Sequence, residues 1–68
     1  MGRSLIEIGE ESLDQAEILE RQKRLAEANI LYRRALWAFR YHERLTSEQP
    51  FLLDDSLAGV QRTASPEQ

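Results

Sequence analysis

Apolar residues recur at helical spacing through most of this chain. Between Glu10 and Gln49 there is neither glycine nor proline, and strong helix formers (Ala, Leu, Glu, Arg and Gln) dominate the interval. Pro50 disfavours helical geometry at the residue before it, so the helical region is predicted to end there. At 100° per residue, the second half of the region places one broad apolar arc on a single side. The arc contains Leu25, Ala28, Leu31, Tyr32, Ala35, Leu36, Ala38 and Phe39.

The same pattern decides between one long helix and two shorter ones. A single helix over residues 10–48 would be about 60 Å long and would need a continuous heptad seam, which the sequence does not sustain. The pairs Glu17–Arg21 and Glu20–Arg24 have i,i+4 spacing and favour unbroken helix. Because burial of an apolar face stabilises most helices, the pattern predicts a bend near residues 22–24. One continuous helix is the alternative.

Two serine motifs could start the first helix. Ser4-x-x-Glu7 and Ser12-x-x-Gln15 both fit the capping box, in which side chains and backbone amides pair reciprocally. A glycine inside a helix costs about 1 kcal/mol, so Gly9 argues against a start at Ser4. We therefore expect the main helix to begin between Gly9 and Ser12, after a short apolar lead-in.

A short third helix is predicted beyond Pro50. Leu52, Leu53, Leu57 and Val60 line one side of it, and Asp54 or Asp55 would be its N-cap. The predicted fold is therefore all-α: an antiparallel helical hairpin followed by a short C-terminal helix. We expect residues 1–62 to form one small domain and residues 63–68 a disordered tail.

Residues 16–36, AEILERQKRLAEANILYRRAL, resemble a tetratricopeptide repeat, the helix–turn–helix unit of about 34 residues. Small side chains match at Ala16, Ala28 and Ala35, and large ones match at Leu19, Leu25 and Tyr32. We place this single degenerate repeat at roughly residues 9–42. The resemblance implies a hairpin of that type, and an unrelated helical hairpin is the alternative.

The sequence departs from the repeat at three positions. The turn glycine is replaced around Lys23, the first-helix tryptophan position holds Ser12, and the terminal proline position holds Arg40. Such repeats need about three copies to bury a continuous core. The resemblance therefore implies that this hairpin is completed by oligomerisation or by a partner.

A second apolar strip lies on a different side of the second helix. Ile30, Trp37 and Tyr41 follow one another at spacings of seven and four residues, and Arg33 and Arg44 lie beside them. Large exposed apolar patches mark interaction sites, and Trp and Tyr are common anchors. We expect these five residues to bind a protein partner. The alternative is that residues 50–60 fold back over the strip within the same chain.

A second candidate surface lies on the first helix. By analogy with the inner side of a repeat hairpin, Leu13, Glu17 and Arg21 would line it. The resemblance to the repeat family implies this surface as the alternative partner-binding site.

The composition makes association with another chain more plausible. The chain has 68 residues and no cysteine, so disulfides are excluded. A core of this size supplies roughly 3–5 kcal/mol unless something reinforces it. We therefore expect a homo-oligomer, or a small adaptor, accessory subunit or inhibitor held by a larger protein.

Charge is segregated along the chain, although the net charge is only −3. Residues 1–20 carry a net −5, residues 21–44 a net +5 and residues 45–68 a net −3. This segregation suits an antiparallel hairpin, or an antiparallel dimer in which each acidic helix meets the other copy's basic one. Arg33, Arg40 and Arg44 with Trp37 and Tyr41 could also meet phosphates and bases, so a nucleic-acid-associated regulator is the alternative function. The acidic composition favours a protein partner over nucleic acid.

Candidate catalytic chemistry is sparse. His42 has no cysteine or evident serine–aspartate set to join, so we expect it at the surface or the core edge. The acidic run is expected to be a solvated face, because bundle metal sites use Glu-x-x-His pairs that this sequence lacks. That run contains Glu7, Glu10, Glu11, Asp14 and Glu17. We expect a non-enzymatic protein without metal or cofactor, located in the cytoplasm and without a membrane span.

Overall fold

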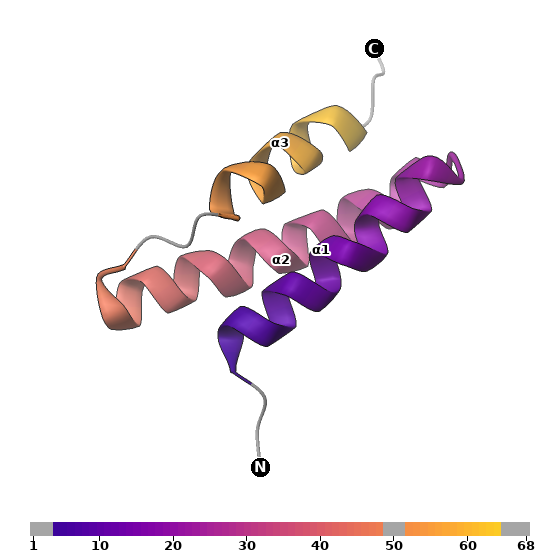
Figure 1. Ribbon diagram of the computed structural model, residues 1–68. Coiled ribbons are helices and arrows are strands. Elements are labelled where there is room, and N and C mark those ends of the chain that lie inside the picture. The colour runs from indigo at the N-terminus through magenta and orange to yellow at the C-terminus, as the bar shows by residue number, and fades with distance from the viewer. Residues whose placement is uncertain (1–3, 49–51, 65–68) are drawn as a thin grey trace.

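The computed structural model describes residues 4–48 and 52–64, and these form three α-helices (Figure 1). Helix α1 spans Leu5–Arg21, α2 spans Leu25–Thr46 and α3 spans Leu53–Thr63. α1 and α2 pack as an antiparallel hairpin, and α3 lies along α2. The predicted all-α hairpin with a short third helix is confirmed, as is the break between the first two helices. Of the segment predicted as a tail, Thr63 belongs to α3, and residues 65–68 lie outside the described residues.

The first helix begins at Leu5, so the predicted start between Gly9 and Ser12 is wrong. Ser4 is the N-cap: its hydroxyl accepts from the Glu7 amide at 3.1 Å, and the Glu7 carboxylate accepts from the Ser4 amide at 3.3 Å. Gly9 lies inside α1 because the helix passes over the ring of Phe39. A Cβ at Gly9 would lie within 2.9 Å of three atoms of that ring. The glycine therefore permits close helix packing and does not end the helix.

The turn between α1 and α2 is a Schellman motif. The Arg24 amide donates to the Leu19 carbonyl at 2.9 Å, and the Lys23 amide donates to the Glu20 carbonyl at 3.0 Å. Lys23 adopts a left-handed conformation with φ of 65°, at the position that usually holds glycine. Because α1 ends before Arg24, the Glu20–Arg24 pair that a continuous helix would allow does not form. Arg24 instead donates to the Glu27 carboxylate at 2.9 Å.

The ends of the other helices are set by different signals. α2 ends at Thr46, where Ser47 has φ of 64° and its amide donates to the Glu43 carbonyl at 2.7 Å. The predicted end before Pro50 is confirmed. α3 begins at Leu53, two residues earlier than an Asp54 N-cap would allow, so the prediction of an aspartate N-cap is wrong. Leu52 is the N-cap without a side-chain bond, and Asp54 and Asp55 lie in the first turn, where their charges favour the helix dipole.

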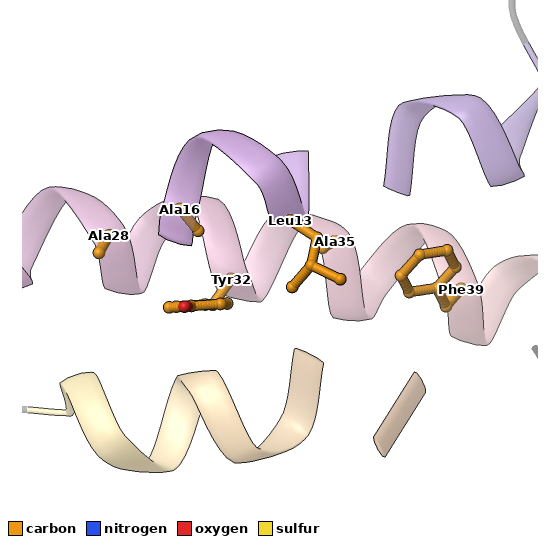
Figure 2. Close-up of a cluster of buried hydrophobic side chains, with 6 residues drawn as sticks. All are labelled: Leu13, Ala16, Ala28, Tyr32, Ala35 and Phe39. Atoms are coloured by element: carbon orange, nitrogen blue, oxygen red, sulfur yellow. The ribbon is translucent and has the colours of Figure 1, made fainter. Parts of the chain in front are cut away.

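The core consists of two aromatic side chains surrounded by small residues (Figure 2). Tyr32 and Phe39 are fully buried. Alanines from both helices allow the backbones of α1 and α2 to approach closely. On the other side, Gly59 of α3 lies so close to the Tyr32 ring that a Cβ there would overlap it. The buried cluster contains Leu13, Ala16, Ala28, Tyr32, Ala35 and Phe39.

Polar contacts fix the C-terminal part of α3 on α2. The side-chain amide of Asn29 donates to the Val60 carbonyl and to the Thr63 hydroxyl, both at 3.2 Å. The Thr63 hydroxyl donates in turn to the Gly59 carbonyl at 2.7 Å. These bonds and the Tyr32–Gly59 contact determine which side of α2 the third helix covers.

Candidate partner-binding groove

A groove of about 650 Å³ runs along α2 where it borders α3. Three arginines, two aromatic residues and two aliphatic residues line it, and only one of them belongs to α3. We call this surface the α2 groove. Its lining residues are Arg33, Leu36, Trp37, Arg40, Tyr41, Arg44 and Val60.

The aromatic residues of the groove are exposed. The Trp37 and Tyr41 rings have centroids 5.5 Å apart with an interplanar angle of 36°. Trp37 is 56% exposed, Tyr41 is 44% exposed and Ile30 is 62% exposed. The alternative that the chain folds back over this strip is therefore wrong for residues 52–60. The reason is the docking of α3 on the side of α2 that carries Tyr32 and Asn29.

The arginines of the groove have no anionic partner in the described part of the chain. Neither an ion pair nor a hydrogen bond from Arg33, Arg40 or Arg44 reaches any side chain within residues 4–48 and 52–64. All three side chains are exposed. The groove thus combines apolar rings with positive charge that the described residues do not neutralise.

Four of the five predicted partner-binding residues line the same groove. Arg33, Trp37, Tyr41 and Arg44 meet there, whereas Ile30 is exposed on α2 outside its lining. The lining also includes Leu36 and Val60, which the sequence had assigned to packing faces. Arg40 was predicted to join these residues only in the nucleic-acid alternative, although its spacing of three residues from Trp37 already placed it nearby.

The alternative surface on the first helix does not assemble as predicted. Leu13 is only 4% exposed and belongs to the core, because it lies on the side of α1 that faces α2. Glu17 and Arg21 are exposed on α1. Without Leu13 the surface lacks the apolar residue that the sequence assigned to it.

A polar network connects all three helices. The sequence pattern does not predict it. The Tyr32 hydroxyl of α2 donates to Glu20 Oε1 of α1 at 2.6 Å. Arg62 of α3 donates to both oxygens of the same carboxylate, through Nε and Nη2, at 2.9 Å each. The guanidinium group also lies 5.7 Å from the centre of the Tyr32 ring. No sequence signal pointed to this network, because Glu20 and Arg62 are 42 residues apart.

The network shifts the pKa values of its three members. Hydrogen bonds from Arg62 and Tyr32 lower the pKa of Glu20 to about 2, because they favour the ionised carboxylate. Burial and the hydrogen bond to Glu20 raise the pKa of Tyr32 to about 12. The pKa of Arg62 is also raised, chiefly by the bonds to Glu20. At neutral pH the network therefore holds one carboxylate, one guanidinium and one neutral phenol.

The outer side of α1 is acidic and exposed, as predicted for a solvated face. Its carboxylates are those of Glu7, Glu10, Glu11, Asp14 and Glu17. Within the described residues, no three carboxylate or imidazole groups converge in a way that could hold a metal ion. His42 is half-buried, and its carbonyl accepts from the Thr46 hydroxyl at 2.9 Å.

None of the helices in residues 4–48 and 52–64 combines the length and the apolar character needed to cross a bilayer. The tetratricopeptide resemblance stays a prediction. Comparison of the chain with protein families, with characterised proteins and with solved structures found no match.

Proposed function

We propose that this protein is a non-enzymatic interaction module that binds a protein partner in the α2 groove. The observation that carries the proposal is the exposure of Trp37 and Tyr41 between arginines that lack anionic partners in the described residues. Burial of an exposed tryptophan releases roughly 25 cal/mol per Å² of apolar surface, and Trp, Tyr and Arg are the most frequent interface anchors. An adaptor, an accessory subunit or a protein inhibitor would each use such a surface.

The charge of the groove defines the chemistry of its partner. Three guanidinium groups on one side of α2 favour carboxylates, which they can bind in a bidentate manner. The aromatic rings favour Leu, Phe or Trp side chains between those carboxylates. We therefore propose that the partner presents an acidic segment with apolar anchors.

Selection from a displayed peptide library tests this proposal. We expect the enriched peptides to combine Asp or Glu with large apolar residues. The Trp37→Ala variant is expected to bind these peptides at least about tenfold more weakly, a loss of about 1.4 kcal/mol. Trp37 is the single tryptophan, so its fluorescence emission reports peptide binding by wild type, and the fluorescence anisotropy of a labelled peptide compares wild type with Trp37→Ala.

A matched control separates the groove from apolar exposure in general. Leu25 is 41% exposed at the start of α2 and does not line the groove. Leu25→Ala is expected to leave peptide affinity unchanged. Equal binding by wild type and Trp37→Ala, or enrichment of no peptide at all, would contradict the proposal.

A second candidate function is nucleic-acid binding, and the shared groove of Arg33, Arg40 and Arg44 with two aromatic rings favours it. Titration against duplex and single-stranded DNA at two salt concentrations tests it. Binding through three phosphate contacts would lose affinity steeply as salt rises, with a log–log slope of roughly −2 to −3. Absence of binding at low salt would eliminate this function.

A further inference from the structure

We propose that the α2 groove binds the outer face of α1 on a second copy of this chain, so that copies associate head to tail. This inference rests on the proposed function, because it names one occupant of the same groove. It is carried by the charges and by the positions of two surfaces on the hairpin.

The outer face of α1 has the chemistry that the groove favours. Glu10, Asp14 and Glu17 are exposed there at spacings of four and three residues, so their carboxylates follow one another on neighbouring turns. Ile18 is 47% exposed beside them and supplies an apolar contact. This surface is therefore an acidic segment with an apolar anchor.

The arginines of the groove are spaced in a compatible way. Arg33, Arg40 and Arg44 follow one another at seven and four residues along the same side of α2. Trp37 lies between them and is available for an apolar contact. When α1 of one copy lies along α2 of another, a row of carboxylates meets a row of guanidinium groups around the tryptophan.

The two surfaces lie on opposite sides of the hairpin. Ile18 is nine residues from the buried Gly9, and Trp37 is nine residues from the buried Ala28. Nine residues correspond to about two and a half helical turns, so each exposed residue points away from the core. The acidic face thus points outward from α1, and the groove points outward from α2.

This placement selects the mode of association. A reciprocal two-fold dimer, in which each acidic helix meets the other copy's basic helix, would need both surfaces on one side of the molecule. Surfaces on opposite sides instead give heterologous contacts, which form rings or open chains. A symmetric pair of α2 grooves is disfavoured, because it would place arginines against arginines.

Two charge-neutralising variants test the arrangement. Arg33→Gln/Arg44→Gln removes charge from the groove and keeps the acidic face, whereas Glu10→Gln/Asp14→Asn removes charge from the acidic face and keeps the groove. By sedimentation equilibrium at high micromolar concentration, each variant alone is expected to show the monomer mass of 7.9 kDa. Their equimolar mixture retains one intact interface, so it is expected to form a one-to-one complex and nothing larger.

Wild type is expected to behave differently from either variant. Its average mass should exceed the monomer mass at least about twofold at about 0.05 M salt and fall toward the monomer at about 0.5 M, where charges are screened. Ala58→Glu/Gln61→Glu adds two negative charges to exposed positions of α3 and should leave association unchanged. Arg33→Gln/Arg44→Gln alters the net charge equally and should abolish association. Circular dichroism verifies that the variants keep their helices.

Three results would overturn head-to-tail association. They are a monomeric wild type at low salt, a mixture of the two variants that forms no complex, and association that survives Arg33→Gln/Arg44→Gln. A monomeric wild type that still binds acidic peptides through Trp37 would leave the proposed function intact. Loss of both self-association and peptide binding would overturn both.

Discussion

The carboxylate of Glu20 joins three helices at a single point. It accepts from Tyr32 on α2 and from two nitrogens of Arg62 on α3, and it comes itself from the last turn of α1. The Glu20 side chain is 26% exposed, whereas the Arg62 side chain is 54% exposed. A bidentate pair that also holds a buried hydroxyl stabilises more than an ordinary surface ion pair does.

Acidification is expected to weaken this contact. The pKa of Glu20 in the fold is about 2, below its ordinary value of 4.5, so its ionised form stabilises the fold above pH 4.5. That stabilisation is lost as the pH falls from 4.5 through 2. We expect wild type to exceed Glu20→Gln by about 1 kcal/mol at neutral pH, a value reduced for the solvent exposure of Arg62. The difference should narrow toward zero near pH 2.

Urea unfolding of both proteins over this pH range measures the effect. Glu17→Gln is the control, because Glu17 is exposed on the same helix and should change stability by only a few tenths of a kcal/mol. If the wild type and Glu20→Gln curves stay parallel from neutral to acid pH, the network does not act as described.

At the scale of elements, the packing of α3 on α2 requires a glycine at position 59. Gly59→Ala should destabilise the fold by about 1–3 kcal/mol, because the added Cβ would overlap the fully buried Tyr32 ring. Helix propensity alone predicts the opposite sign, a gain of about 1 kcal/mol. Thermal unfolding of Gly59→Ala beside the exposed substitution Gln61→Ala separates the two effects. A stabilised Gly59→Ala would show that α3 does not contact Tyr32.

A glycine in the turn between α1 and α2 is expected to stabilise the fold. Lys23 has a positive φ, which costs a residue with a Cβ about 1–2 kcal/mol, and glycine avoids that cost at some loss of chain entropy. We expect Lys23→Gly to stabilise the fold by about 0.5–1 kcal/mol. Lys23→Ala keeps the positive φ and removes only the long side chain, so its stability should stay near wild type. Equal effects of the two substitutions would contradict this explanation.

Element-level predictions succeeded where spacing alone determines the answer. Two helices, the break near residues 22–24 and the exposure of Trp37 all follow from which residues share a helix face. The predicted start of α1 is wrong because helix propensity counts only the local cost of Gly9, whereas the role of this glycine depends on Phe39, far along the chain. The Glu20–Arg62 contact was missed for the same reason. The local pattern of apolar residues determines which face of each helix is buried, whereas the roles of Gly9 and Glu20 depend on residues far along the chain.

At the scale of the whole molecule, α2 is the central element. α1 and α3 both pack on it, and the described residues leave its remaining side exposed (Figure 1). α1 shares the buried cluster with α2, whereas α3 adds only partly buried side chains to it, among them Leu53 and Val60. The α2 groove borders α3, which contributes less to the buried cluster than α1 does. Val60 is the residue of α3 that lines the groove.

The unequal packing predicts that α3 opens before the hairpin does. Local opening requires less free energy where fewer apolar contacts are broken. Native-state hydrogen exchange should therefore show the amides of residues 56–63 exchanging at least about tenfold faster than those of residues 28–39, about 1.4 kcal/mol less in opening free energy. Gly59→Ala should widen this difference by releasing α3 from Tyr32. Identical opening free energies in the two segments would mean that the molecule unfolds as one unit, and the groove would then be as rigid as the core.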